Sequence, residues 1–371
     1  MSIPPIEPRR AMPTPTERRR AGEVVRPDDL DFFRSTIAVV RDGASLSREV
    51  AGRMMSLLIH GSVPEEDVAA YLAALADKGE SVEEIVASAR VLLDAAVPFP
   101  CTLDALDTCG TGGDGSRTFN VSTLAALVVA SAGQPVVKHG NRSSSGGVGS
   151  ADLLEALSVP TQLEPGRSAE MMHRLGFAFL FAPLYHPGAR RVAPVRRRLG
   201  RRTIFNLLGP LCNPARPAYQ VLGVPAFHLA HKMAEALRRL GTRRAFVVSG
   251  PGSVDELLPA EGNRVIEVAA SRLVLCEMSH VDAGLTPSTV ENLGGGDATR
   301  NAVIAHDVLH GQRGAPRDAV VMNAGLALLA AGRVSSLAEG CAACEATIDR
   351  GDASRLLDDL RHFPSTEGAA P

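Results

Sequence analysis

The chain has 371 residues, with 39 Lys and Arg against 41 Asp and Glu, a formal net charge of -2 and a charged fraction of 22%. This length suits one large and one small domain, and the balanced charge lacks the basic excess of a nucleic-acid-binding protein. We therefore expect no nucleic-acid partner. No run approaches the roughly 18 apolar residues of a membrane helix, so we also expect no membrane span.

The six cysteines are too sparse for a disulfide framework, which favours a reducing cytoplasm. They stand at Cys101, Cys109, Cys212, Cys276, Cys341 and Cys344. Only the last two form a CxxC pair, and that pair lies in the alanine-rich pattern SLAEGCAACEATIDRG. We interpret it as helix packing and not as a metal or redox site.

The N-terminal part of the chain predicts an extension followed by a helical unit. Residues 1–30 are rich in Pro and Arg without an apolar core, which predicts a disordered extension and not a signal peptide. Residues 31–100 show helical apolar spacing throughout, with start and stop signals at LSREVAGRMMSLLIHG, PEEDVAAYLAALADKGE and SVEEIVASARVLLDAA. They predict a small all-helical domain.

Over residues 101–365 the apolar pattern is no longer helical throughout, and it predicts an α/β domain. Short strand-like runs, PVVKHG, RRAFVVSG and NRVIEV, alternate with the helical runs TLAALVVASAG and FHLAHKMAEALRRLG. This alternation is typical of a mainly parallel central sheet covered by helices. From 318 to 360 the pattern returns to alanine-rich helix.

The segment DTCGTGGDGSRTFNVSTLAALVVASAG runs from a short strand through four glycines into a helix opened by Asn120, Ser122 and Thr123. Glycines let backbone N–H groups approach an anion, and a helix N-terminus adds partial positive charge. The segment therefore indicates a phosphate cradle, although alone it equally fits a tight strand-to-helix turn. It is neither a Walker loop nor a GxGxxG fingerprint.

A second polar loop follows the next strand, in VVKHGNRSSSGGVGSADLLEALSV, with Lys138, His139, Asn141 and Arg142 among serines and glycines. Two such loops at neighbouring strand ends suit a ligand with several phosphate oxygens. The alternative is a flexible surface loop, which does not explain why these side chains come directly after a strand that is apolar enough to be buried.

Two further segments suggest a metal and an aromatic acceptor. In FVVSGPGSVDELLPAEG, Asp255 and Glu256 follow a strand, and carboxylates beside a diphosphate are what Mg²⁺ requires, although an isolated DE pair is more often a solvated turn. In GFAFLFAPLYHPGARRVAPVRRRLG, an apolar run joins Tyr185 and His186 to a group of arginines. An arginine fork pairs with a carboxylate and apolar walls suit a ring, but most of these arginines should be solvated.

These segments together resemble the anthranilate phosphoribosyltransferase family over about residues 35–360. GTGGD, TFNVST, KHGNR, GSADLLEAL, VAPVR, RTIFNLLGPLCNP and VDEL stand in the family's order. The resemblance implies a small helical domain, which gains a later segment near 165–200, joined to a larger α/β domain, and a homodimer. It also implies magnesium-dependent transfer of phosphoribose from phosphoribosyl diphosphate (PRPP) to anthranilate, giving N-(5-phosphoribosyl)anthranilate and diphosphate in tryptophan biosynthesis.

The resemblance also assigns roles to individual positions. It places PRPP at Gly110, Gly113, Asp114, Thr118, Asn120, Ser122, Thr123, Lys138, Ser145 and Ser150. It places two magnesium ions among the diphosphate, Ser122, Asp255 and Glu256. It places the acceptor among Gly110, His139, Asn141, Pro183, His186 and Arg196, with Arg196 meeting the ring carboxylate.

Lys138 and His139 are the expected catalytic residues. Developing charge on the departing diphosphate calls for electrostatic stabilisation by Mg²⁺, Lys138 and loop amides, and His139 is expected to orient the acceptor. A ring amine is already neutral at pH 7, so no strong general base is required.

The sequence departs from the family pattern in two places. Gly147 and Val148 stand where Lys and Ser are common, and the small pair Gly188 and Ala189 predicts spare volume near the ring. The alternatives are therefore transfer to another, substituted aromatic acceptor, or a non-catalytic relative that binds nucleic acid. The intact motifs and the net charge of -2 argue against the latter.

Overall fold

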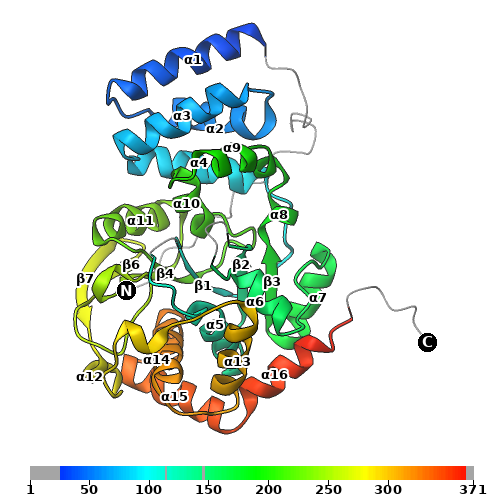
Figure 1. The fold of residues 1–371 in the computed structure, drawn as a ribbon, viewed down its shortest axis with the longest axis vertical. Coiled ribbons are helices and arrows are strands. Elements are labelled where there is room, and N and C mark those ends of the chain that lie inside the picture. The colour runs from blue at the N-terminus through cyan, green and yellow to red at the C-terminus, as the bar shows by residue number, and fades with distance from the viewer. Residues whose placement is uncertain (1–25, 113–114, 144–146, 365–371) are drawn as a thin grey trace, which may run out of the picture.

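The computed structural model describes residues 26–112, 115–143 and 147–364. It consists of a helical part at one end and a larger part built on a sheet at the other (Figure 1). The first helix begins at Pro27, inside the range predicted as a disordered extension. That boundary was wrong because Pro at the first helical position, followed by Asp28 and Asp29, is a favourable helix start.

Four helices form the bundle of the helical part. Ser47 caps the second helix, and Ser81 forms a capping box with Glu84 at the start of the fourth. The rings of Phe33 and Tyr71 meet edge to face in the core, with centroids 5.6 Å apart. The bundle helices are α1 (Pro27–Arg41), α2 (Arg48–His60), α3 (Glu65–Lys78) and α4 (Val82–Ala95).

The larger part is built on a seven-stranded sheet in the order β3-β2-β1-β4-β5-β6-β7. The first five strands in this order are parallel, and β6 and β7 join them as an antiparallel hairpin. The strands are β1 (Leu106–Gly110), β2 (Val136–Gly140), β3 (Phe177–Phe181), β4 (Tyr219–Gly223), β5 (Arg244–Ser249), β6 (Asn263–Ala269) and β7 (Arg272–Met278).

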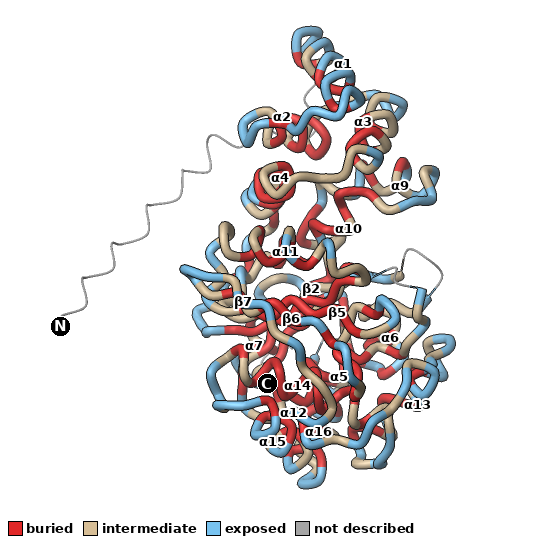
Figure 2. Tube along the Cα trace, turned by 90° about the vertical axis from the view of Figure 1, so that its left-hand side faces the viewer, coloured by how far each residue is buried: buried red, intermediate tan, exposed pale blue. Residues whose placement is uncertain are grey.

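Helices cover both faces of the sheet. α5 (Val121–Ser131) and α14 (Ala315–Ala330) lie on one face, where they contact each other and β1 and β4, and α11 (Phe227–Leu240) lies on the other against β5 and β6. Figure 2 shows the buried positions concentrated along the strands and in these covering helices. A helical domain joined to an α/β domain with a mostly parallel sheet confirms the predicted fold class.

A later segment returns to the bundle between β3 and β4. Arg198 pairs with Glu65 at 2.7 Å and Arg201 pairs with Asp77 at 2.7 Å, which holds this segment against α3. The segment comprises α8 (Ala182–Tyr185), η2 (Pro187–Arg191), α9 (Ala193–Leu199), α10 (Ile204–Leu208) and η3 (Gly209–Leu211). In the range 165–200 expected to join the bundle, α7 (Pro165–Leu175) and β3 instead pack in the α/β part.

The bundle and the sheet share one hydrophobic core. α4 packs on α11, and α11 packs on β5 and β6, so the apolar side chains of the bundle are continuous with one face of the sheet. On β5, Phe246 and Val248 face the α5 side while Ala245 and Val247 face the α11 side, as strand alternation requires.

The remaining short segments and helices complete the α/β part around α5 and α14. They are α6 (Ser150–Ala156), η4 (Pro251–Ser253), α12 (His280–Ala283), η5 (Val290–Leu293), α13 (Ala298–Leu309), α15 (Leu337–Asp349) and α16 (Asp352–Arg361). Cys341 and Cys344 are buried free thiols of α15, which packs closely on α14. This confirms the interpretation of that CxxC pair as helix packing.

Of the helices in the described part of the chain, none combines the length and the apolar character needed to cross a membrane.

Glu84 offers a test of what stabilises the bundle. Its buried carboxylate accepts hydrogen bonds from Lys78 Nζ at 2.9 Å and from the backbone N–H groups of Leu46 and Ser81 at 2.9 and 2.7 Å. Glu84→Ala removes the acceptor of all three bonds and leaves the ammonium of Lys78 with the carbonyl of Gly79 in place of its carboxylate, so it should lower the free energy of unfolding by about 3 to 5 kcal/mol in urea denaturation. Glu83→Ala, at the partly exposed neighbour, should cost under about 1 kcal/mol, and equal losses would contradict the assignment.

Candidate functional site

The strand order places a crevice at one edge of the sheet. β1 continues to β2 and β3 on one side and pairs with β4 and β5 on the other, so the winding of the chain reverses between β1 and β4. In parallel α/β sheets, ligands bind outside the carboxyl ends of the strands at this switch point. The glycine loop, the KHGNR loop and the loop with Asp255 all follow such strand ends, after β1, β2 and β5.

Two glycines let the acidic loop lie directly on the strand ends. Gly110 ends β1 and Gly223 ends β4, and the two are register partners. A Cβ atom at Gly110 would overlap Asp255 Oδ2, and one at Gly223 would overlap the backbone carbonyl of Asp255. Any larger residue would push the carboxylate away from the sheet edge.

Hydrogen bonds join the glycine loop to the acidic loop. The N–H of Gly112 donates to Asp255 Oδ2 at 2.8 Å, and Thr118 Oγ1 donates to Glu256 Oε2 at 3.3 Å. On its other side, the carbonyl of Gly112 accepts from the Arg202 guanidinium. The loop between β1 and α5 is therefore held by the two expected metal carboxylates and by an arginine that sequence reasoning missed.

One small cavity is lined by Ser122, Asp255 and Glu256, the three expected metal residues. Its volume of about 10 Å³ is close to that of one water-sized sphere. Asn323 of α14 lines the same cavity. Two carboxylates and a hydroxyl around so small a space fit Mg²⁺, which takes one or two carboxylates and completes its shell with water and phosphate oxygens.

Lys138 lies behind this cavity and not at its open edge. Its buried ammonium donates to the carbonyl of Thr108 at 2.5 Å and to Ser122 Oγ at 3.4 Å. Burial lowers the pKa of Lys138, an effect opposed by the negative charges of Asp107 and Glu256. Burial also raises the pKa of Asp107 to about 6. These contacts hold the amino group of Lys138 directly beneath Ser122.

The loop after β2 is tied to α5 and α6. Asn120 Nδ2 donates to the carbonyl of Val148 at 2.7 Å. Asp152 Oδ2 accepts from the N–H groups of Gly149 and Ser143 at 2.8 and 3.1 Å. Val148, one of the departures from the family pattern, therefore helps to hold the loop through its backbone carbonyl.

Two neighbouring histidine rings, of which His186 is buried and His139 is partly buried, mark the expected acceptor region. His139 and His186 meet edge to face with centroids 5.1 Å apart. His186 Nε2 bonds the carbonyl of Cys212 at 2.8 Å, and His139 Nδ1 bonds that of Gly209 at 3.3 Å. A ring nitrogen beside a carbonyl must carry the proton, so His139 Nε2 holds the lone pair. This Nε2 is buried and has no hydrogen-bond partner among the described residues.

Arg196 lies on the same side, near α10. Its guanidinium is 5.2 Å from the centroid of the Phe205 ring, and α10 runs from that region to Gly209, the partner of His139. Burial lowers the pKa of Arg196. No carboxylate or carbonyl of the described chain pairs with this guanidinium, although other arginines of the segment, such as Arg198, form ion pairs.

The remaining acceptor positions are less closely linked. Pro183 accepts a hydrogen bond from Arg190 at its carbonyl, and Asn141 is an exposed loop residue whose carbonyl accepts from Ser150 Oγ. The spare volume predicted at Gly188 and Ala189 is absent. A Cβ at Gly188 would lie 2.9 Å from the carbonyl of Ile59, and Ala189 packs on the bundle core.

The structure thus gathers most predicted residues at one sheet edge. Thr123, in the first turn of α5, lies there too, but its side chain is buried. Gly113, Asp114 and Ser145 lie outside the described residues. Sequence reasoning missed Gly223, Arg202 and Asn323. Of these, only Arg202 could have been found from the sequence, because it is the first residue of the quoted motif RTIFNLLGPLCNP.

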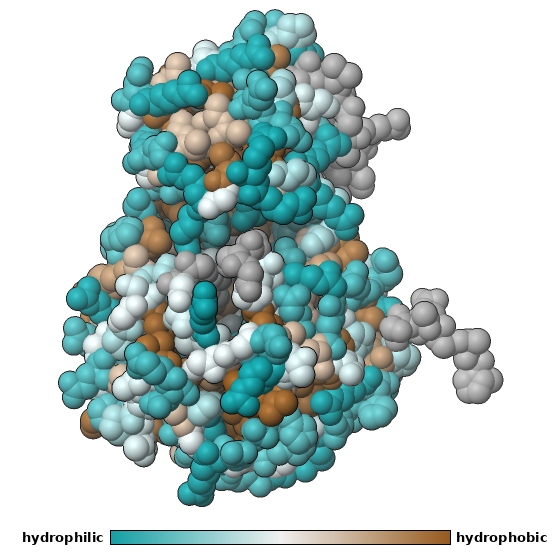
Figure 3. Space-filling view, in the orientation of Figure 1, coloured by the Kyte–Doolittle hydropathy of each residue, from teal (hydrophilic) through white to brown (hydrophobic). Residues whose placement is uncertain are grey.

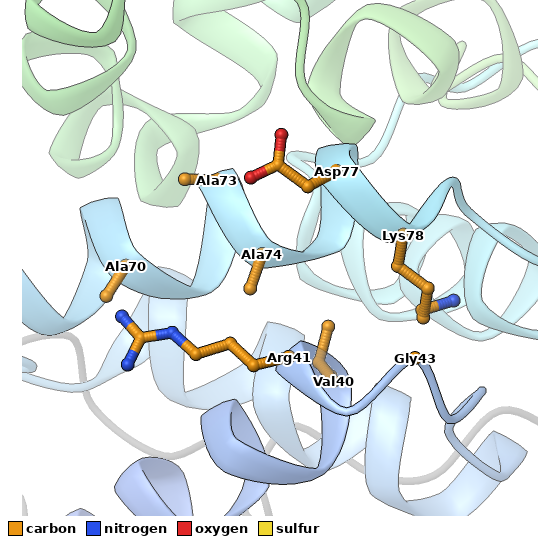
Figure 4. A pocket seen from close by; sticks show the side chains of 8 residues that line it. All are labelled: Val40, Arg41, Gly43, Ala70, Ala73, Ala74, Asp77 and Lys78. Atoms are coloured by element: carbon orange, nitrogen blue, oxygen red, sulfur yellow. The ribbon is translucent and has the colours of Figure 1, made fainter.

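A larger cavity than that at Ser122 lies between α1 and α3. It measures about 330 Å³ and contains three alanines with Arg41, Asp77 and Lys78 (Figure 4). Lys78 is paired with Glu84 and Asp77 with Arg201, so its charges are already partnered. We place the chemistry at the smaller cavity because the carboxylates, the hydroxyl and the loop amides converge there. The constriction between the two parts of the molecule is visible in Figure 3.

Comparison with known families agrees with this architecture. Residues 34–96 match the glycosyl transferase family, helical bundle domain, and residues 102–354 match the glycosyl transferase family, a/b domain. The helical bundle, the sheet and the polar edge of β1 and β4 therefore define a two-domain glycosyl transferase.

Individual relatives narrow the class. The chain is 43% identical to an anthranilate phosphoribosyltransferase of Syntrophomonas wolfei, over 90% of this chain and 98% of that protein. It is 44% identical to the crystal structure of the Thermus thermophilus enzyme, with a TM-score of 0.83 over 88% and 98% of the two chains. The Saccharomyces cerevisiae enzyme in complex with PRPP and Mg is 26% identical, with a TM-score of 0.79 over 88% and 97%.

The chain belongs to the anthranilate phosphoribosyltransferase family, and it is an enzyme of the transferase class.

The buried state of His139 predicts a pH dependence. Burial, aided by His186, lowers its pKa to about 3, against about 6.5 in an unfolded chain. The unfolded state therefore binds this proton first, and stability present above pH 6.5 is lost as the pH falls. Between pH 7.5 and 5.0, this residue should account for a loss of up to about 2 kcal/mol.

The test compares wild type and His139→Gln by urea unfolding at both pH values. The variant should lose less stability than the wild type on acidification. Equal losses would mean that His139 is not held neutral by the fold.

Proposed function

We propose that the protein transfers the phosphoribosyl group of PRPP to the amine of anthranilate, releasing diphosphate, as a step of tryptophan biosynthesis. The observation that carries the choice of acceptor is the guanidinium of Arg196, which has no anionic partner among the described residues. A partly desolvated arginine without an anion is incompletely satisfied, and a ring carboxylate supplies the missing partner. The flat Phe205 ring beside it adds an apolar wall.

The phosphate end of PRPP belongs at the ends of β1 and β2. Gly110, Thr118, Asn120 and Ser122 surround the crevice there, and α5 directs its N-terminal N–H groups toward it. Ser150, at the start of α6, closes the loop after β2. The S. cerevisiae relative was solved with PRPP and Mg, which supports the same ligands here.

Magnesium would be held by Asp255, Glu256 and Ser122. These residues border one small cavity, and we propose two ions held among these residues and the diphosphate, which extends the site beyond the cavity. Bound Mg²⁺ stabilises the negative charge that develops on the departing diphosphate. Lys138 adds a fixed positive charge beneath Ser122, which acts over a short distance in a buried, low-dielectric setting.

The acceptor end uses His139 as a hydrogen-bond acceptor. The bond between C1 of the ribose and the diphosphate oxygen breaks, the amine nitrogen bonds C1, and the cationic nitrogen so formed then gives up one proton to solvent water. The buried lone pair on His139 Nε2 can accept an N–H of the amine and aim the nitrogen at C1. Because the fold keeps this ring neutral, the interaction orients the nucleophile without a charged base.

The same proposal includes a homodimer in the cytoplasm. The support for the compartment is that all six cysteines are free thiols, three of them buried. The dimer follows from the family resemblance, and light scattering of the purified chain tests it by molar mass.

The deciding experiment follows diphosphate release by purified protein with PRPP and Mg²⁺. Anthranilate is compared with methyl- and halogen-substituted anthranilates and with ring amines that lack the carboxylate. We expect turnover with anthranilate and none with the decarboxylated amines. If another ring were turned over at higher kcat/KM, that ring would replace anthranilate as the proposed acceptor. Inactivity with all of the amines would support the alternative that the protein is a non-catalytic relative.

Arg196 can be tested against its neighbour in the same helix. Arg196→Ala should raise the KM for anthranilate by about 10- to 150-fold without a matching change for PRPP, because a charged hydrogen bond is worth about 1.5 to 3 kcal/mol. Arg197 is exposed, and Arg197→Ala should behave as the wild type. The measurement is steady-state kinetics with each substrate varied, and an unchanged KM for anthranilate would place the carboxylate elsewhere.

Glu256 tests the metal site. Glu256→Gln removes a negative ligand but keeps the shape of the side chain, so kcat should fall by about two orders of magnitude or more at fixed Mg²⁺. The concentration of Mg²⁺ that gives half-maximal activity should also rise. Glu261→Gln, an exposed position in the same stretch, is the matched control. If Glu256→Gln behaved as the wild type, the assignment of the metal site to this loop would be wrong.

A further inference from the structure

Two asparagines hold the chain directly after the acidic pair. Asn323 Oδ1 accepts from the N–H of Leu257 at 3.1 Å, and its Nδ2 donates to the carbonyl of Leu257 at 2.8 Å. One residue later, Asn263 bonds both the N–H and the carbonyl of Leu258, at 2.8 and 2.9 Å. All four residues are buried.

Of the two, only Asn323 reaches the metal cavity. It lines the same small space as Ser122, Asp255 and Glu256, whereas Asn263 does not. Asn323 is itself anchored, because its Nδ2 also donates to the carbonyl of Ala319 one turn earlier in α14 at 2.9 Å. The side chain therefore transmits the position of a long, buried helix to the residue that follows Glu256.

We propose that Asn323 is a positioning residue for the magnesium carboxylates. Its amide fixes both polar groups of the Leu257 backbone, and the adjoining peptide sets where Glu256 and Asp255 stand over the ends of β1 and β4. The inference rests on the metal site proposed above, and it adds to that site a residue 67 positions beyond Glu256 in the chain.

The chemistry explains why an amide is needed at this position. Leu257 presents one donor and one acceptor, and of the side chains of this length only an amide offers the complementary pair in one plane. A carboxylate would accept from the N–H but repel the carbonyl, and an apolar side chain would satisfy neither. With its buried backbone unpaired, the loop would shift to find other partners, and the carboxylates would shift with it.

The test compares Asn323→Leu with Val321→Ala. Val321 is fully buried two residues earlier in α14 and does not line the cavity, so its variant loses packing without touching Leu257. The first readout is Mn²⁺ binding in the presence of diphosphate, followed by electron paramagnetic resonance. The second is the Mg²⁺ concentration at half-maximal activity, and the third is the melting temperature.

Outer residues that hold metal ligands typically contribute 10- to 100-fold in metal affinity. Asn323→Leu should therefore weaken Mn²⁺ binding and raise the half-maximal Mg²⁺ concentration by about that factor, with the KM for anthranilate unchanged. Val321→Ala should lower the melting temperature and leave metal binding as in the wild type. If Asn323→Leu does not fold, Asn323→Ala, which removes both bonds without adding bulk or charge, should show the same metal defect.

Two results overturn the inference. One is wild-type Mn²⁺ affinity in the folded Asn323 variant, and the other is an equal loss in Val321→Ala, which would make the effect one of general stability. Failure of the proposed metal site itself would be distinct, because the wild type would then show neither Mn²⁺ binding with diphosphate nor a Mg²⁺ requirement.

Discussion

The polar edge of the sheet depends on the contact between the backbone of the acidic loop and the ends of β1 and β4. Gly110 and Gly223 lie side by side in adjacent strands, and only their missing side chains allow Asp255 to rest there. From that position the carboxylate reaches the N–H of Gly112, and Glu256 reaches Thr118. The crevice is therefore assembled by backbone proximity first, and the charged groups are added to a frame that is already fixed.

The two ends of the crevice differ in how their charges are treated. At the phosphate end, burial lowers the pKa of Lys138, and the negative charges of Asp107 and Glu256 oppose this effect. At the acceptor end, Arg196 has an aromatic neighbour but no anion in the part of the chain that the structure describes, and burial lowers the pKa of both histidines. A ligand that brings a carboxylate to one end and a diphosphate with its cations to the other completes both halves.

Much of this arrangement follows from the sequence because parallel strands end at the same edge. The loops after β1 and β2 were predicted to meet from their glycines and polar side chains, and the resemblance to the family added the carboxylates after β5. The contacts across the edge could not be predicted: the approach of Asp255 depends on Gly223, and the fixing of Leu257 depends on Asn323, both distant in the chain. The return of the chain to the bundle after β3 was placed too early, because the apolar positions of α9 stand among exposed arginines.

The core that α4 and α11 share bears on how such a chain can diversify. Residues 34–96 and 102–354 match separate families, which suggests interchangeable modules. Yet the side chains that seat the bundle on α11 also close the second face of the sheet. A bundle borrowed from a relative would carry a face shaped for a different α11, and the misfit would reach β5 and β6. Exchanging the bundle therefore requires matching changes on α11.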